Sequence, residues 1–240
     1  MVTATTSGST FTASGVTLVS SSSALSVRTI DLAGNVTTGT GHSYTLDTIA
    51  PSVSITSETS NNATSTLAKA GDVITVAFTS TDTVTSVTIG GRTATVTNTS
   101  GNNYTATYTV QPADNALATT VAVTSTDVAG NTTTQNLAAA VTIDTVAPTA
   151  TATVTALSAD TGTSGSDFIT RTAAQTVSGT FTGTLGTGET IQVSADGSTW
   201  VTATTSGSTF TASGVTLVSS SSALSVRTID LAGNVTTGTG

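Results

Sequence analysis

The sequence contains no cysteine and very few residues that carry charge or favour helices. Without disulfides, the fold must be held by a buried core, by bound metal or by neighbouring units. Charged residues make up 8 % of the chain and aromatic residues 4 %, so the strong helix formers lysine, arginine, glutamate and methionine are scarce. This composition argues against a helical protein.

Positive charge is especially rare, with five basic against thirteen acidic residues and a net charge of −8. A nucleic-acid partner requires a basic surface, so the composition excludes nucleic-acid binding. No apolar run approaches the roughly 18 residues that span a bilayer, and no signal-peptide pattern follows Met1. We therefore expect no membrane insertion of this segment.

Threonine, serine, alanine, valine and glycine dominate the chain, and hydrophobic residues make up 36 % of it. Disordered chains combine low hydrophobicity with high net charge, so we expect this chain to be folded. Threonine and valine favour strands, and their abundance predicts an all-β protein.

An exact internal repeat organises the sequence. Residues 2–41 recur unchanged at residues 201–240, an offset of 199. Identity over such a length indicates a recently copied array, of which this chain is one window. Met1 stands where Trp200 stands in the second copy, so we expect the window to begin at an arbitrary cut.

A weaker repeat of about half this length lies inside the period. The run LDTIAP at 46–51 returns as IDTVAP at 143–148, a spacing of 97. Proline cannot donate to a sheet and biases its predecessor to extended geometry, so Ala-Pro suits a junction between modules. A second motif, DxAGN, occurs at 31–35, 127–131 and 230–234.

Apolar residues alternate along most of the chain, which is typical of strands. Each complete period of the weaker repeat offers about seven short strands separated by turn signals, and this pattern predicts antiparallel β-sandwiches. Gly90-Gly91 predicts a hairpin turn. In the middle of the chain the alternating apolar residues are Ile74, Val76 and Phe78, then Val87 and Ile89, then Tyr104, Ala106, Tyr108 and Val110, then Val121 and Val123, and finally Leu137, Ala139, Val141 and Ile143.

The repeat divides the chain into three parts. Residues 1–48 hold only the later strands of a module, residues 49–146 form a complete module, and residues 147–240 lack the final strand of theirs. That strand would have the sequence of residues 42–47. A missing edge strand leaves ladder groups open to another chain, so we hypothesise that the 42–47 strand completes the last module between chains.

Several sequence runs resemble a known family. The runs DTGTSGSDFIT (160–170), GETIQVS (188–194) and DGSTW (196–200) look like the bacterial immunoglobulin-like tandem repeats of giant biofilm-associated surface adhesins. LAKAGD (67–72) and VTIGG (87–91) resemble a second version of the same repeats, so the resemblance covers essentially the whole chain.

The resemblance implies tandem immunoglobulin-like β-sandwiches arranged end to end, with neighbouring repeats of the same protein as their partners. It also implies type I secretion, an extracellular location on the bacterial cell surface and a stalk that extends a ligand-binding tip. Many such repeats bind calcium at the poles of their domains, so calcium is the cofactor that the resemblance suggests.

Two acidic residues form one candidate calcium site. Asp160 and Asp167 flank a loop of glycine, serine and threonine, and calcium takes six to eight oxygen ligands from such flexible segments. The alternative is structural: Asp160 begins an Asx turn and Asp167 caps a strand.

The junctions form a second set of candidates. In a seven-strand sandwich the loop before the last strand lies at the entry pole, so Asp230 and Asn234 should face the linker that bears Asp144. By the same count of strands, Asp127 and Asn131 should face the linker that bears Asp47. Glu58 should point toward the Asp144 junction. The alternative treats DxAGN as a turn, in which glycine takes a positive φ and asparagine bonds its own backbone.

Catalysis finds little support. His42 is the only histidine, and no Ser-His-Asp arrangement is indicated around it. Glu58 and Glu189 fall on different modules, so they do not suggest a glycosidase pair. Trp200, Tyr104 and Tyr108 suit core packing better than a sugar-stacking platform, because aromatic residues are so few.

The sequence therefore predicts a non-enzymatic structural extender, the stalk repeat of a large extracellular bacterial adhesin, stiffened by calcium at its junctions. The alternative is a repeat that itself binds carbohydrate, other cells or ice. A module accessory to an enzyme elsewhere in the parent chain ranks third.

Overall fold

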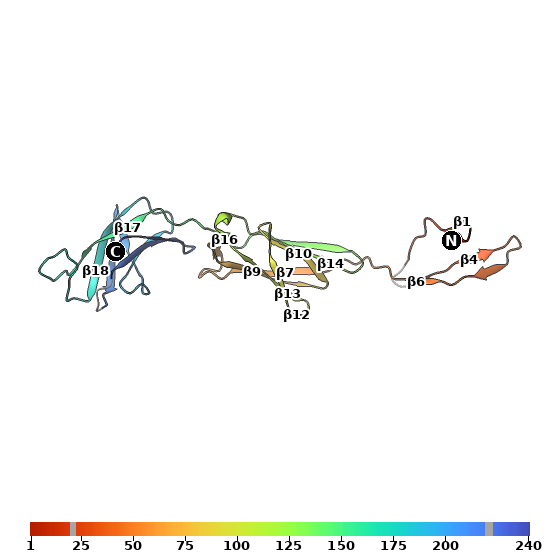
Figure 1. The fold of residues 1–240 in the computed structure, drawn as a ribbon, viewed down its shortest axis with the longest axis horizontal. Helices are drawn as coiled ribbons and strands as arrows, with labels where there is room; N and C mark the ends of the chain where they lie inside the picture. The colour runs from red at the N-terminus through yellow and green to blue at the C-terminus, as the bar shows by residue number, and fades with distance from the viewer. Residues whose placement is uncertain (20–22, 219–222) are drawn as a thin grey trace.

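The computed structural model describes residues 1–19, 23–218 and 223–240. Within them the chain is almost wholly β, and the helical element is a single 3-10 turn, η1 (Pro112–Asp114). Figure 1 shows an elongated molecule whose groups of strands follow one another along its long axis. We call residues 1–48 the N-terminal segment, residues 49–146 the middle segment and residues 147–240 the last segment.

The middle segment contains two four-stranded antiparallel sheets and one short parallel pair. The first sheet has the order β12 (Thr95–Ser100), β13 (Asn103–Thr109), β9 (Val73–Ser80) and β7 (Val53–Ser60). The second has the order β11 (Arg92–Thr93), β10 (Thr83–Ile89), β14 (Val121–Thr126) and β15 (Thr132–Leu137). Beside them, β16 (Thr142–Ile143) pairs in parallel with β8 (Leu67–Ala68).

The alternating apolar residues of β9 and β14 are buried in one cluster with residues of β7, β10 and β13, as the apolar pattern predicted. The predicted run from Leu137 to Ile143 is not one strand, because Ala139 is exposed between β15 and β16. Tyr104 packs against this cluster, and its ring stacks on Phe78 with the ring centroids 5.4 Å apart. The predicted Gly90-Gly91 turn is confirmed, since Ile89 pairs with Arg92 across it and both glycines have positive φ. The most deeply buried side chains of the cluster include Ile74, Val76, Phe78, Val87, Ile89, Val121 and Val123.

The last segment repeats this succession of strands. One sheet has the order β21 (Thr204–Ser206), β22 (Thr209–Thr216), β18 (Ala174–Thr182) and β17 (Thr151–Leu157). The other has the order β20 (Val201–Thr202), β19 (Thr190–Ser194), β23 (Ser225–Ile229) and β24 (Val235–Thr237). Both sheets contribute to a second buried cluster that includes Ala152, Val177, Ile191, Val193, Phe210, Ala212 and Val226.

Residues 2–41 of the N-terminal segment have the same sequence as residues 201–240 but are not packed in the same way. The six strands of the segment form three separate pairs: β1 (Thr5–Ser7) with β2 (Thr10–Thr12), β3 (Ser23–Leu25) with β6 (His42–Tyr44), and β4 (Arg28–Ile30) with β5 (Val36–Thr38). Phe11 is 57 % exposed, whereas Phe210, its copy, is 1 % exposed. Among the described residues of this segment, no strand packs over Phe11 as the second sheet of the last segment packs over Phe210.

No helix among the described residues is long and apolar enough to cross a membrane.

Candidate functional site at the junction of two segments

Each DxAGN motif forms a compact turn closed by its own side chains. Asp230 accepts hydrogen bonds from the backbone amide of Asn234 at Oδ1 and from its side-chain amide at Oδ2, both at 2.8 Å. Asp127 and Asn131 make the same two bonds, and these bonds hold the pKa of Asp127 below its usual value. Gly233 has a φ of +85°, which an L-residue adopts only with strain. The structural role expected of this motif is therefore present.

Each turn also contacts the linker that the sequence placed opposite it. The side-chain amide of Asn234 donates to the carbonyl oxygen of Asp144 at 2.9 Å. The side-chain amide of Asn131 donates to the carbonyl oxygen of Asp47 at 3.1 Å. Among the contacts of the described residues, the carboxylate of Asp144 bonds within its own linker, where Oδ1 accepts the backbone amide of Val146 at 3.0 Å. Asp47 makes the equivalent bond to the backbone amide of Ile49 at 3.0 Å.

Two donors from the middle segment hold the turn of the last segment from the other side. Lys69 Nζ donates to the carbonyl oxygen of Gly233 at 2.8 Å, and Asn62 Nδ2 donates to that of Ala232 at 2.8 Å. Asp72 orients the Asn62 amide, since its Oδ2 accepts Asn62 Nδ2 at 2.7 Å, and it fixes the backbone at Lys69 by accepting that amide at 2.9 Å. These bonds clamp the Asp230–Asn234 turn onto the end of the middle segment.

Sequence reasoning missed Lys69, Asn62 and Asp72 as junction residues. Lys69 is the only lysine of the chain and lies in the LAKAGD run, and this was the one available signal. Its partner is a backbone carbonyl 164 residues away, which no sequence pattern marks. A further bond across the junction runs from the Thr236 hydroxyl to the carbonyl oxygen of Pro148.

Glu58 lies inside the middle segment. It is 7 % exposed, and its Oε2 accepts the backbone amide of Ala140 at 2.8 Å. The other carboxylate oxygen, Oε1, is buried with no hydrogen-bond partner among the described residues. Glu58 thereby anchors the chain that leads into β16 and is not bonded to the Asp144 linker.

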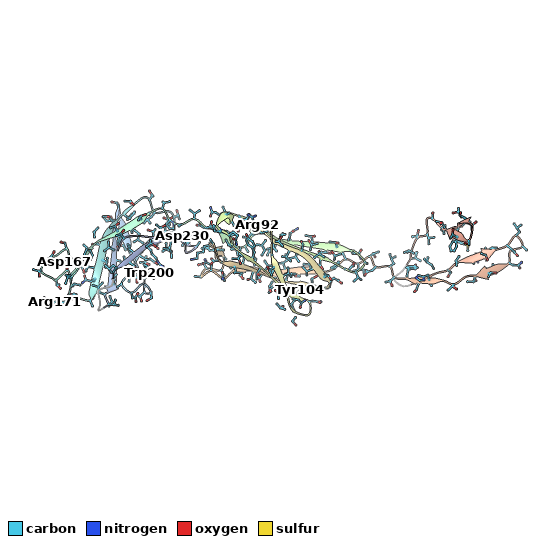
Figure 2. The ribbon with its side chains drawn as sticks, in the orientation of Figure 1. Arg92, Tyr104, Asp167, Arg171, Trp200 and Asp230 are labelled. Atoms are coloured by element: carbon cyan, nitrogen blue, oxygen red, sulfur yellow. The ribbon has the colours of Figure 1, made fainter. Side chains whose placement is uncertain are left out.

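Asp160 and Asp167 lie in one loop, between β17 and β18. Asp160 Oδ2 accepts the backbone amide of Phe168 at 3.0 Å, and Asp167 Oδ1 accepts that of Ile169 at 3.1 Å. Phe168 has a φ of +60°, and Asp160 Oδ1 is buried with no hydrogen-bond partner in the described part of the chain. Figure 2 shows Asp167 at the outer end of the last segment, whereas Asp230 lies at the end that faces the middle segment.

The structure gathers no other set of acidic side chains into a cluster among the described residues. Within residues 1–19, 23–218 and 223–240, no three histidine, aspartate or glutamate side chains gather closely enough to share a metal ion. His42 is exposed on β6, where it pairs with Leu25. The guanidinium of Arg227 lies 3.8 Å from the ring centroid of Trp200 and covers one face of it.

Comparison with known proteins found partial structural similarity. No protein-family model matches the chain, and no curated protein matches it. A solved structure described as a Ca²⁺-stabilised adhesin that helps an Antarctic bacterium reach out and bind ice is 27 % identical, with a TM-score of 0.40, over 91 % of this chain and 55 % of that one. The chain thus spans about half the length of that adhesin structure.

Two other solved structures show less similarity. The surface glycan-binding protein PbSGBP-B from Prevotella bryantii is 10 % identical with a TM-score of 0.24, over 80 % of this chain and 42 % of that one. The gamma-CGTase of alkalophilic Bacillus clarkii is 10 % identical with a TM-score of 0.23, over 89 % of this chain and 29 % of that one. All three TM-scores are low, so function is argued below from the residues of this chain.

We expect the Lys69 bond to limit motion at the junction. Replacing Lys69 by alanine removes a charge-assisted hydrogen bond, which contributes about 1.5–3 kcal/mol, so the population of open junctions should rise by tenfold or more. Because the chain has no cysteine, two can be introduced for spin labels at exposed Thr97 and Ser208. The distance distribution between the labels should broaden in Lys69→Ala.

The control for this experiment is Arg28→Ala, which also removes one positive charge but lies in the N-terminal segment. Its distance distribution should match that of the parent chain. Equal distributions for Lys69→Ala and the parent chain would show that the clamp does not hold the junction.

Proposed function

We propose that the chain is a structural spacer repeat of a large extracellular bacterial adhesin, exported by type I secretion and displayed on the cell surface. In this proposal residues 49–146 are a complete immunoglobulin-like module. Residues 1–48 are the C-terminal part of another, and residues 147–240 are a module that lacks its final strand. The modules follow one another end to end and separate a ligand-binding tip from the cell.

The observation that carries this proposal is the clamped junction. Lys69 and Asn62 from one segment and Asn234 from the next make three hydrogen bonds to backbone carbonyls across it. Bonds to the backbone need only the shape of a turn on the accepting side, so each 199-residue period can form this joint once. A joint of constant geometry converts the number of repeats into length, which is what a spacer requires.

The length contributed by each module follows from its strands. Strands of about ten residues with a rise of ~3.3 Å per residue span roughly 30–40 Å. We expect solution scattering from chains with one, two and three periods of the repeat to show a maximum dimension that rises by a constant increment per period. A dimension that levels off would show that the repeats fold back on one another.

The alternative function, binding by the repeat itself, is separated from the spacer role by a direct assay. The same chains can be applied to a glycan array and to growing ice crystals. A pure spacer should bind neither surface. Saturable binding that increases with the number of repeats would replace the spacer role with a ligand-binding one.

We also propose that calcium binds in the loop that contains Asp160 and Asp167. Support comes from Asp160 Oδ1, which is buried and has no hydrogen-bond partner among the described residues. Calcium prefers carboxylate and carbonyl oxygens, and both carboxylates lie in this one loop. The ion would supply the charge that compensates the buried oxygen and would hold the loop in one conformation.

The position of this loop gives calcium a mechanical role. The segments 61–72 and 158–173 occupy equivalent places, since they connect β7 to β9 and β17 to β18, which are neighbours in their sheets. Residues 61–72 form the clamp of the junction described above. We propose that residues 158–173 meet the next module, and that the two kinds of joint alternate. One joint then uses the Lys69 ammonium, and the other uses calcium.

Calcium should raise the melting temperature of the last segment. With a dissociation constant of about 10⁻³ M, typical of extracellular modules, 10 mM calcium would stabilise the segment by about 1.4 kcal/mol, a shift of several degrees. Asp160→Asn should abolish the shift, whereas Asp82→Asn in the middle segment should keep it. The fluorescence of Trp200 reports melting of the segment, and equal melting with calcium and with chelator would remove the ion from the proposal.

A further inference from the structure

The linker between the middle and last segments is held from both sides. On one side, the carbonyl oxygens of Asp144 and Pro148 accept hydrogen bonds from the last segment. On the other side, Thr145 is the last linker residue that bonds to a loop of the middle segment among the described contacts. Two residues separate Thr145 from Pro148. The bonds of Thr145 therefore mark the point beyond which the chain is free of the middle segment.

The η1 turn supplies both of these bonds. The Thr145 hydroxyl donates to the carbonyl oxygen of Pro112 at 2.8 Å. The Thr145 backbone amide donates to Oδ1 of Asn115, the residue after the turn, at 3.1 Å. Figure 1 shows β16, which leads into this linker, at the end of the middle segment that faces the last segment. The turn thus grips the chain where it leaves the middle segment.

Asp114 anchors the turn to both sheets of the middle segment. Its carboxylate accepts the hydroxyl of Tyr108 on β13 and pairs with Arg92 on β11, and these strands belong to different sheets. Just beyond the turn, Leu117 packs against the buried cluster. A turn fixed at these points does not move with the linker, so its bonds to Thr145 restrain the linker.

The backbone next to the turn is strained. Ala116 has a φ of +57°, which residues other than glycine rarely adopt. In this conformation its backbone amide donates to the carbonyl oxygen of Ile143 at 3.1 Å, at the end of β16. Strained backbone persists where surrounding contacts maintain it, and such positions often serve function. Here the strain accompanies a third bond between this loop and the departing chain.

The turn and the Lys69 clamp are separate holding points. Residues 61–72 bond to the Asp230–Asn234 turn of the last segment, through Lys69 and Asn62. The η1 turn bonds to the linker itself and belongs to a different loop, between β13 and β14. Because the donors and acceptors of the two sets of bonds are different residues, loss of one set leaves the other in place.

We propose that η1 and Asn115 form a second clamp of the joint, and that their bonds to Thr145 set the direction in which the last segment leaves the middle segment. The proposal rests on the spacer role, since a spacer needs joints of constant direction. Asn115 and Thr145 are positioning residues, because they act on the last segment only through the path of the linker.

The test measures distances between spin labels on introduced cysteines at exposed Thr97 and Ser208 of the full chain. Asn115→Ala removes the acceptor of the Thr145 amide, and Thr145→Val removes the hydroxyl while keeping the shape of the side chain. Each change deletes one neutral hydrogen bond, so the population of open joints should rise roughly twofold to tenfold and the distance distribution should broaden. In a Lys69→Ala chain the same changes should broaden it further.

Two control variants accompany this measurement. Thr145→Ser keeps the hydroxyl and should restore the parent distribution. Thr48→Val removes the equivalent threonine of the other linker, between the N-terminal and middle segments, and should leave the distribution unchanged. Circular dichroism checks that each variant is folded at the temperature of the measurement, so that broadening reports the joint and not an unfolded module.

Broadening by Asn115→Ala and Thr145→Val, in the parent chain or in the Lys69→Ala chain, supports the second clamp. Distributions that match their parents in both chains would overturn it. Equal broadening by Thr145→Ser and Thr145→Val would also overturn it, because the hydroxyl would then play no part. These outcomes are separate from the spacer role, which is measured by the length gained per period in solution scattering.

Discussion

Replacing Phe210 by alanine is expected to destabilise the last segment by about 3–5 kcal/mol, whereas the same replacement at Phe11 should cost less than about 0.5 kcal/mol. The two phenylalanines have identical neighbours in sequence for many residues on either side. Phe210 is 1 % exposed within the buried cluster of the last segment, and Phe11 is 57 % exposed. The difference in cost therefore measures tertiary packing alone.

Urea unfolding provides the measurement. Trp200 is the only tryptophan and lies in the last segment, so its fluorescence follows the unfolding of that segment. Phe210→Ala should lower the midpoint of the fluorescence transition with little change in its slope, and Phe11→Ala should leave the circular-dichroism curve of the whole chain unchanged. Equal curves for the two variants would mean that residues 201–240 are no better packed than their copy.

Replacing Asp114 by alanine is expected to destabilise the middle segment by about 3 kcal/mol. Asp114 is 1 % exposed, and its Oδ2 accepts the hydroxyl of Tyr108 at 2.5 Å and the backbone amide of Gln111 at 2.8 Å. Its Oδ1 pairs with Arg92 at 3.0 Å. Removing the carboxylate leaves the Tyr108 hydroxyl and the Gln111 amide without their acceptor.

The matched control is Arg92→Ala. The Arg92 side chain is 53 % exposed, and pairs with an exposed partner contribute little, so this change should cost at most about 1 kcal/mol. Circular dichroism during urea unfolding measures both variants. An equal cost for the two changes would assign the effect to the ion pair and not to the buried hydrogen bonds.

Asp114 should also make the stability of the middle segment depend on pH. Burial opposes ionisation of Asp114, but hydrogen bonds from Tyr108 and Gln111, together with Arg92, outweigh it and lower its pKa. Stabilisation by a carboxylate with a lowered pKa is complete above the unfolded value of about 3.9 and is lost as the pH falls through the folded value. The stability difference between the parent chain and Asp114→Ala should therefore be constant from pH 7 to about pH 5 and shrink below about pH 4. A difference that stays constant through the acid range would exclude this linkage.

Much of the local structure could be predicted because local chemistry decides it. The alternation of Ile74, Val76 and Phe78 placed a strand with one buried face, and the structure has β9 there. Gly90-Gly91 indicated a two-residue turn because both positions need a positive φ. Counting the strands of a sandwich predicted that Asn234 faces the linker that bears Asp144. In the structure the side-chain amide of Asn234 donates to the carbonyl oxygen of Asp144.

The chemistry of the junction could not be predicted in the same way. The sequence suggested acids that converge on calcium, and this stays a prediction. The described contacts at the junction are the amides of Asn62 and Asn234, the Lys69 ammonium and the Thr236 hydroxyl, all on backbone carbonyls. Asp144 and Asp230 instead accept hydrogen bonds from their own turns. Which of two neighbouring oxygens, carboxylate or carbonyl, faces a junction depends on backbone dihedral angles that composition and spacing do not report.

By itself the sequence determined the repeat, the strand periodicity, the turns and the absence of a basic or helical surface, because each of these depends on residues close together along the chain. Tertiary structure alone decided whether an apolar residue is buried. Phe11 and Phe210 share one sequence yet differ in exposure from 57 % to 1 %. Burial requires a second layer of strands, which the described residues place against Phe210 and not against Phe11.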